Sequence, residues 1–180
     1  VSWIQSVFHG FGSSWIIPET GILLNNRLTG FSLDPQSPNI IAPGKRPAHT
    51  LNAFTAVHPD GSLYLVGGTP GANIQVQSNL QLLVNVIDLK MNVQEATEAP
   101  RWQHLNAAGQ SSEEEKGAGV LEIENRVSAE VFEQLRAKGH EVNALSAWGH
   151  GSSVQMMEVL ANGTFAFGSD PRCEGHASGI

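Results

Sequence analysis

The chain has 180 residues, 41% of them hydrophobic and 15% charged, with a formal net charge of −7. This composition suits one folded domain with a single large core. The ten Lys and Arg residues are scattered and no apolar run reaches about 18 residues, so neither a nucleic-acid surface nor a membrane span is predicted.

The first part of the chain predicts short strands and turns. Residues 1–8 are β-branched and aromatic, which predicts a strand, and the chain begins within it without Met or a signal peptide. We therefore expect this sequence to be part of a longer product. Residues 10–26 predict two short apolar strands around a Pro-Glu-Thr-Gly turn, and the proline-rich residues 34–47 predict irregular chain.

A hairpin and a helix are predicted next. Residues 51–57 and 62–68 flank His58-Pro59-Asp60-Gly61, which is a hairpin signal. Residues 74–90 carry apolar side chains at helical spacing, and we expect a well-buried helix there. Its predicted apolar face consists of Val76, Leu80, Leu83, Val84 and Ile87, widened by Leu82, Val86 and Leu89.

The remaining chain predicts further helices and strands. A short helix is expected at 92–100, ended by Pro100, and an exposed polar loop at 110–119. A strand at 119–124 precedes a helix that runs from a Ser128 cap to Lys138. A second hairpin turns at Asn162-Gly163. Together these elements predict one α+β layered domain over residues 1–180.

The stretch LVGGTPGANIQ (65–75) places a glycine-rich turn between a predicted strand and a predicted helix. It lacks the Lys of a phosphate-binding P-loop and the spacing of a dinucleotide fingerprint. Backbone amides at a helix N-terminus can hold a developing oxyanion. The alternative is a turn whose glycines merely allow close packing.

Other candidate groups point to no metal or cofactor. The seven histidines show neither HxH nor HExxH spacing, so we expect no metal site. His150, between two glycines, is expected to be an ordinary loop histidine rather than to line a cleft. Asp170 and Arg172 are expected to form a structural clamp. Cys173, the one cysteine, excludes an internal disulfide and is expected to be inert.

Six motifs in order, SVFHGFGS, ETGILLNN, APGKRP, GGTPGANIQ, QEATEAPRW and GSDPR, resemble the small subunit of the γ-glutamyltranspeptidase family over nearly the whole chain. The resemblance is to a divergent, transpeptidase-like or cephalosporin-acylase-like branch. It implies an N-terminal-nucleophile hydrolase with an αββα sandwich, of which this chain supplies part of the sheets and outer helices. It also implies a precursor that cuts itself into this subunit and a large partner subunit, exposing a catalytic Thr upstream of Val1.

The same resemblance assigns catalytic roles to three residues. The amides of Gly71 and Ala72 stand where the family forms its oxyanion hole. Ser6 stands at the hydroxyl position that orients the nucleophilic Thr, although a strand serine satisfied by local backbone is the alternative.

The substrate-binding positions depart from the family pattern. Phe8 replaces an Asn that contacts the glutamyl carboxylate, and Arg27 replaces a Gln. Gly30 replaces the Asp that pairs with the α-ammonium, while His49 and Thr50 replace a Ser-Ser pair. An ammonium without an anionic partner is costly to desolvate, so these changes suit an acidic acyl group without an amine. Arg27 as a solvated loop residue and His49 as a structural one are the alternatives.

The predicted function is therefore acyl transfer or hydrolysis of small-molecule amides, either γ-glutamyl (glutathione-like) or related acyl amides, through an acyl-enzyme on the upstream Thr. A non-catalytic binding or structural protein with the same fold is the alternative, and a nucleotide-binding domain has little support. Localisation stays open.

Overall fold

The computed structural model describes residues 2–105 and 119–178. It forms two compact units: Val1–Trp3 with Asn52–Ile180, called unit 1, and Ile4–Leu51, called unit 2. The elements in chain order are η1 (Arg27–Gly30), β1 (Phe54–Val57), β2 (Leu63–Gly68), α1 (Ile74–Ile87), α2 (Val93–Glu98), β3 (Trp102–Leu105), β4 (Val120–Glu124), α3 (Ala129–Ala137), β5 (Glu141–Leu145), β6 (Gln155–Val159) and β7 (Phe165–Ser169). The predicted α+β class is confirmed. A single domain over the whole chain stays a prediction.

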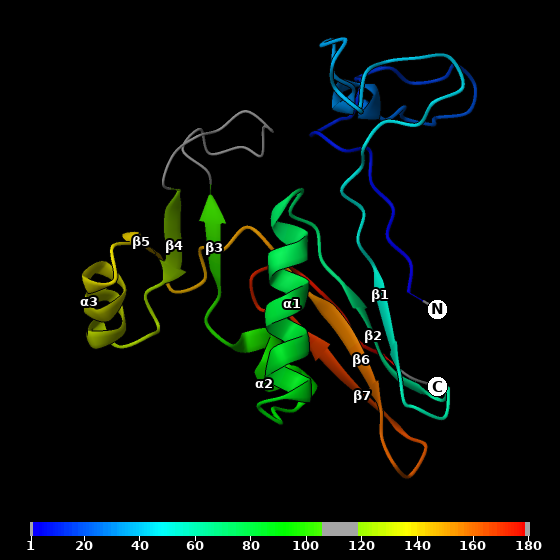
Figure 1. The fold of residues 1–180 in the computed structure, drawn as a ribbon. Coiled ribbons are helices and arrows are strands. Elements are labelled where there is room, and N and C mark those ends of the chain that lie inside the picture. The colour runs from blue at the N-terminus through cyan, green and yellow to red at the C-terminus, as the bar shows by residue number, and fades with distance from the viewer. Residues whose placement is uncertain (1, 106–118, 179–180) are drawn as a thin grey trace. The chain divides into compact units, whose positions relative to one another are not determined.

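A four-stranded antiparallel sheet in the order β1-β2-β6-β7 is the centre of unit 1 (Figure 1). Its two outer pairs are the predicted hairpins, which are confirmed. The turns place Gly61 at φ 85° and Gly163 at φ 82°, a conformation that glycine adopts without steric cost. The pair β2-β6 joins the hairpins and sets Gly67 opposite Met156.

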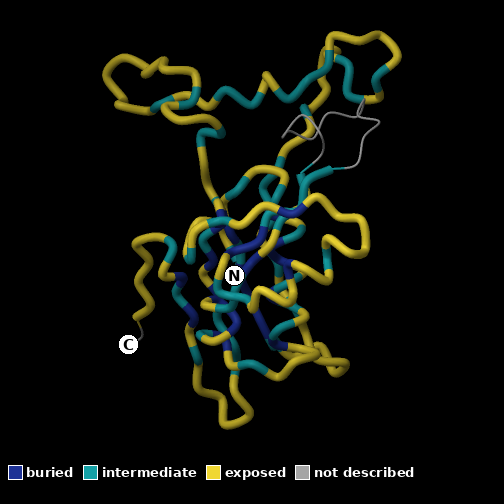
Figure 2. Tube along the Cα trace, turned by 90° about the vertical axis from the view of Figure 1, so that its left-hand side faces the viewer, coloured by how far each residue is buried: buried dark blue, intermediate teal, exposed yellow. Residues whose placement is uncertain are grey.

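Helices α1 and α2 pack against this sheet and enclose the main core (Figures 1 and 2). Asn92 and Glu95 form a capping box at the start of α2. The helix ends at Glu98, just before Pro100, so the predicted short helix is confirmed. The buried core side chains come from α1, α2 and the sheet: Leu65, Leu82, Val86, Val93, Ala96, Val154 and Met156.

The contact between α2 and β7 depends on Gly168. A Cβ at this position would meet the carbonyl group of Val93 and would lie 2.9 Å from Thr97 Cγ2. We expect Gly168→Ala to lower the free energy of unfolding by about 1–3 kcal/mol, because the helix must shift. Urea unfolding of the purified protein measures this. Gly10→Ala is the control, since nothing lies within 4 Å of its added Cβ, and an equal loss in both variants would contradict the packing argument.

A second sheet in the order β3-β4-β5 completes unit 1. Strands β3 and β4 are antiparallel, whereas β4 and β5 are parallel and connected through α3. Ile123, Phe132 and Val142 form a small core between α3 and this sheet. The strand β4 and the helix α3 were predicted; β3 and β5 were not. Residues 110–118 of the predicted polar loop lie outside the described residues.

Helix α1 is confirmed, and Leu82 and Val86 of its predicted apolar face are buried, but most of the other residues predicted for that face are exposed. Val76 is 63% exposed and Leu80 57% exposed. The side that packs on the sheet carries Gln75, Ser78, Asn79, Leu82 and Val86. Apolar residues lie almost all round this helix, so their spacing alone does not determine which side meets the sheet. None of the helices in the described residues is long and apolar enough to span a membrane.

Unit 2 is irregular, and none of its residues is buried (Figure 2). A bridge between Ile16 and Leu23 brackets the predicted Pro-Glu-Thr-Gly turn, and residues 34–47 are irregular as predicted. The strand predicted for residues 1–8 is wrong, because residues 2–7 adopt no strand conformation. Extended chain becomes a strand only when another strand supplies a row of hydrogen-bond partners. Among the described residues no strand pairs with this segment, which makes isolated contacts such as the hydrogen bond from the Asn26 amide to the Val7 carbonyl.

Candidate active site

The glycine-rich turn lies between β2 and α1, as the sequence predicted. Gly71 has φ 130° and Ala72 has φ 48°, and the Ile74 amide donates to the Gly71 carbonyl at 3.0 Å as the helix begins. Among the described residues, the amides of Gly71 and Ala72 donate to no acceptor. Two consecutive free donors at the start of a helix form an arrangement that can bind an anion.

Thr69 ties this turn to the segment that precedes β6. Its side chain is buried, and Thr69 Oγ1 accepts a hydrogen bond from the Ser153 amide at 2.9 Å. The same hydroxyl donates to the Pro70 carbonyl at 2.7 Å. Gly151 lies next to the turn as well, since a Cβ on Gly71 would be 3.7 Å from the Gly151 carbonyl oxygen.

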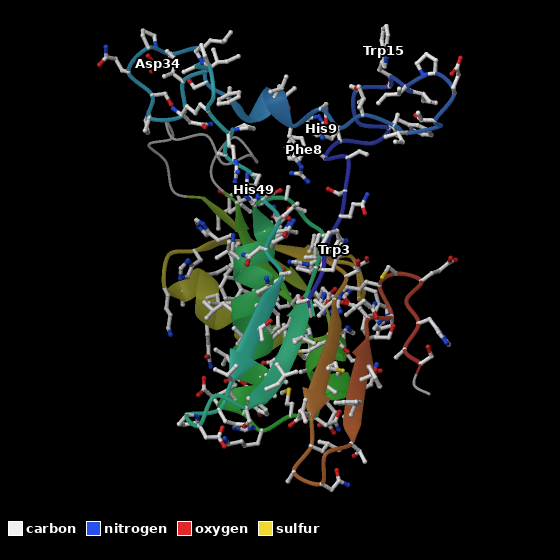
Figure 3. The ribbon with its side chains drawn as sticks, turned by 90° about the vertical axis from the view of Figure 1, so that its right-hand side faces the viewer. Trp3, Phe8, His9, Trp15, Asp34 and His49 are labelled. Carbon is white, nitrogen blue, oxygen red and sulfur yellow. The ribbon has the colours of Figure 1, made fainter. Side chains whose placement is uncertain are left out.

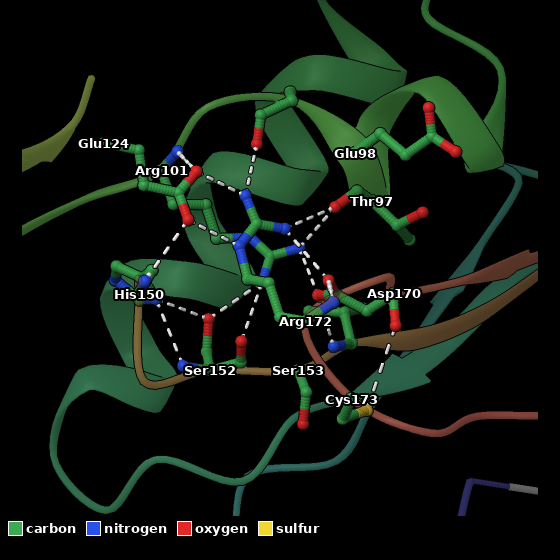
Figure 4. A network of polar contacts seen from close by, with 12 residues as sticks. Thr97, Glu98, Arg101, Glu124, His150, Ser152, Ser153, Asp170, Arg172 and Cys173 are labelled. Atoms are coloured by element: carbon green, nitrogen blue, oxygen red, sulfur yellow. Dashed lines mark hydrogen bonds and ion pairs between the residues drawn. The ribbon is translucent and has the colours of Figure 1, made fainter. Parts of the chain in front are cut away.

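A buried ion-pair network lies behind this segment (Figure 4). Arg172 Nη2 is 2.6 Å from Glu124 Oε2, and Arg172 Nη1 is 2.9 Å from Asp170 Oδ1. Arg101 Nη2 is 2.6 Å from Asp170 Oδ2. The Asp170–Arg172 pair is therefore present, with Glu124 and Arg101 as partners that the sequence analysis did not identify. Burial acts to raise the pKa of Glu124, but hydrogen bonds from Arg172, the Arg101 amide and Arg126 outweigh it and lower that pKa to about 2.

His150 and Ser152 form a buried pair beside the network. The Ser152 amide donates to His150 Nδ1 at 3.1 Å, so this nitrogen carries no proton. Ser152 Oγ, 2.7 Å from the same nitrogen, must donate to it while accepting from Arg101 Nη1 at 2.9 Å. Burial, followed by the charge of Arg101, lowers the pKa of His150 to about 4. The distance would suit a nucleophile and its base, but the side chains are 1% and 4% exposed, which excludes direct attack on a substrate.

The two lowered pKa values predict that stability falls in acid. Unfolded His150 takes up a proton near pH 6.5, whereas the folded side chain does so near pH 4, so the unfolded state binds more protons in that window. A shift of this size corresponds to about 3 kcal/mol of folding stability. The lowered pKa of Glu124 causes a further loss of stability between about pH 4.5 and about pH 2. Unfolding midpoints measured between pH 7.5 and 4 should fall, less steeply in His150→Asn. A flat profile would contradict this prediction.

Three predicted site residues of unit 2 lie together. Arg27 Nη2 donates to Ser6 Oγ at 2.7 Å, and the Phe8 amide lies 3.3 Å from the same oxygen. The Arg27 guanidinium carbon is 5.3 Å from the centre of the Phe8 ring. The Phe8 ring also stacks on His9 (Figure 3). Arg27 Nη1 is buried and has no hydrogen-bond partner among the described residues, so this guanidinium has an unused donor.

The other predicted residues of unit 2 lie along a neighbouring loop. Gly30 packs against the Ala48 carbonyl oxygen, 2.8 Å from where a Cβ would be. Asn39 connects these segments, because its side chain donates to the Gly30 carbonyl and accepts from the Ala48 amide. His49 is exposed, Thr50 is half-buried, and neither makes a hydrogen bond within the described chain. Gly71 and Ala72 belong to unit 1.

Within residues 2–105 and 119–178, no three His, Cys, Asp or Glu side chains gather in a way that suits a metal ion. The candidate ligand-binding groups in the described residues are the free amides of Gly71 and Ala72 at the start of α1 and the spare donor of the Arg27 guanidinium.

Comparison with known proteins identifies the same family. The family model described as Gamma-glutamyltranspeptidase matches residues 1–180. The oxamate amidohydrolase proenzyme of Klebsiella pneumoniae is 38% identical over 99% of this chain and 33% of its own length. The chain spans about a third or less of the first curated relatives it matches.

Solved structures confirm the predicted fold. The Helicobacter pylori γ-glutamyltranspeptidase T380A mutant is 28% identical, with a TM-score of 0.80 over 96% of this chain and 93% of that one. The cephalosporin acylase from Bacillus halodurans is 31% identical, with a TM-score of 0.80 over 96% of this chain and 32% of that one.

Proposed function

The chain belongs to the γ-glutamyltranspeptidase family, and on this basis we propose that it is the small-subunit part of a self-processing amide hydrolase. A Thr upstream of Val1 is the nucleophile, exposed when the precursor cuts itself. The name of the Klebsiella relative, a proenzyme, and the match to nearly all of one Helicobacter pylori chain support a precursor that is cut into separate chains.

The chemistry assigns separate roles to the two sets of residues. The Thr hydroxyl attacks the amide carbonyl, and the amides of Gly71 and Ala72 donate to the oxyanion that forms. The amine then leaves, and water or an acceptor amine releases the acyl group from the Thr. Ser6 accepts from Arg27 through its oxygen, and its proton remains available to orient the nucleophile.

The acyl group that fits best is a small carboxylate without an ammonium. The observation that supports this choice is that Arg27 Nη1 is a buried cationic donor with no hydrogen-bond partner among the described residues, which a substrate carboxylate would satisfy. Gly30 offers no anion for an ammonium, and Phe8 adds apolar surface. Oxamate, named for the 38% identical relative, has a carboxylate, an amide and no ammonium. A γ-glutamyl amide such as glutathione is the second candidate.

The partner proposed is the rest of the same precursor, as its large subunit. The outer side of α1 leaves Val76, Leu80, Val84 and Ile87 exposed. An apolar stripe along a helix is normally buried against another layer. We therefore expect the large subunit to cover this side of α1.

Expression of the complete reading frame tests the proposal. Intact mass spectrometry should give two chains, the smaller one beginning at a Thr upstream of Val1. The processed protein should then release ammonia from oxamate faster than it cleaves glutathione. A single uncleaved mass after long incubation would overturn the enzyme hypothesis, and faster cleavage of glutathione would overturn the choice of acyl group.

Arg27→Gln tests the proposed carboxylate contact. A charge-assisted hydrogen bond contributes about 1.5–3 kcal/mol, so kcat/KM for oxamate should fall about 10- to 100-fold. Arg46→Gln, which removes an exposed arginine of the same unit, is the control and should leave the steady-state kinetics of oxamate hydrolysis unchanged. Equal kinetics in both variants would remove Arg27 from the substrate site.

A further inference from the structure

The free amides of Gly71 and Ala72 are useful only if the turn holds them in one orientation. The turn is not a low-energy conformation by itself, because Ala72 has φ 48° and Gly71 has φ 130°. Non-glycine residues with positive φ are held in place by their surroundings. One such restraint is the hydrogen bond from the Ser153 amide to Thr69 Oγ1 at 2.9 Å.

The position of the Ser153 amide depends in turn on the residues beside it. Ser152 is held through three of its groups by two partners: its amide and hydroxyl bond to His150 Nδ1, and Arg101 Nη1 donates to its carbonyl and hydroxyl at 3.1 and 2.9 Å. On the other side of Ser153, the Val154 amide donates to Asp170 Oδ2 at 2.8 Å. The Ser153 amide therefore has little freedom to move.

His150 is anchored separately from the turn. Its amide donates to Glu124 Oε1 at 3.2 Å, and its side chain is 4% exposed. Its ring bonds through Nδ1 to the amide and the hydroxyl of Ser152. A continuous series of contacts thus runs from the ion-pair network through His150, Ser152 and Ser153 to Thr69.

We propose that His150, Ser152 and Thr69 are positioning residues that orient the amides of Gly71 and Ala72 toward the oxyanion. This inference depends on the proposed function, since it assigns the buried residues behind the turn to the same reaction. None of the three touches the substrate. Their effect should appear in the step in which negative charge develops and not in substrate binding.

Two pairs of variants in the processed full-length protein test the proposal. Thr69→Val removes the hydroxyl and keeps the shape, whereas Thr69→Ser keeps the hydroxyl. His150→Asn places an amide oxygen near the position of Nδ1, whereas His150→Gln places its polar atoms further out, near Nε2. Thr55→Val makes the same chemical change as Thr69→Val at an exposed position of β1 and is the control.

With oxamate as substrate, we expect Thr69→Val and His150→Gln to lower kcat about 10- to 100-fold, the loss of one to two such contacts, with KM nearly unchanged. Thr69→Ser, His150→Asn and the control should stay close to the parent protein. Equal kcat within both pairs would overturn the positioning role, and so would losses confined to KM. If Thr69→Val does not fold, the His150 pair decides alone. A parent protein without activity on any amide would instead reject the proposed function.

Discussion

Glu124→Gln is expected to lower the free energy of unfolding by about 3–5 kcal/mol, because it removes one partner from a buried ion-pair network. The Glu124 side chain is fully buried. Its two oxygens accept from Arg172, Arg126 and the amides of Arg101 and His150. With a neutral amide in its place, Arg126 loses its ion-pair partner, and Arg101 and Arg172 share the one carboxylate of Asp170.

Urea or thermal unfolding of the processed protein measures this loss. Glu122→Gln is the matched control, since Glu122 lies two residues away on β4, is only half-buried and bonds to Gln103. It should change the free energy of unfolding by less than about 1 kcal/mol. A loss of similar size in both variants would show that the β4 backbone, and not the network, limits stability.

Local sequence signals predicted most elements of unit 1. Gly61 and Gly163 marked both hairpins because a tight turn requires positive φ, which glycine adopts easily. Pro100 marked the end of α2, which stops at Glu98. Such signals act within a few residues of one another, so they can be read without knowledge of the rest of the fold.

Features that depend on distant parts of the chain were not predictable in the same way. Strands β3 and β5 are short, with four and five residues, and each becomes a strand by pairing with β4. The sheet on which α1 packs determines which side of the helix is buried. Because apolar residues such as Val76 also lie on the other side, the sequence did not distinguish the buried side from the exposed one. The segment 1–8 has the composition of a strand but no described partner.

For the candidate site, too, local motifs were predictable from the sequence and long-range contacts were not. The resemblance to a family indicated Gly71, Ala72 and Ser6, since those positions belong to ordered motifs. The contact between Arg27 and Ser6, 21 residues apart, required the structure. So did the burial of Glu124, which in sequence is one more acidic residue on a strand. His150 between two glycines was expected to be an ordinary loop residue, and only its hydrogen bonds to Ser152 indicate a larger role.

Gly71→Ala is expected to have the largest effect on activity. At φ 130° the backbone is in a region that is nearly exclusive to glycine, and the added Cβ would lie 2.8 Å from Ile74 Cγ1. The turn must therefore change its conformation, which moves the amides away from the proposed oxyanion position. Loss of one such donor lowers kcat about 10²- to 10³-fold, and KM should change little because the ground-state carbonyl is bound less strongly than the oxyanion.

Ala72→Gly is the comparison variant, because it changes a residue of the same turn without introducing strain. It keeps the amide and removes the Cβ from a residue with φ 48°, so kcat should stay close to that of the parent protein while the free energy of unfolding rises by up to about 1 kcal/mol. Steady-state kinetics on oxamate, measured for both variants after processing, compare them directly. If Gly71→Ala keeps full kcat, the oxyanion is not held at this turn. If Ala72→Gly loses as much activity as Gly71→Ala, the orientation of the amides depends on the restricted backbone of a non-glycine residue at position 72.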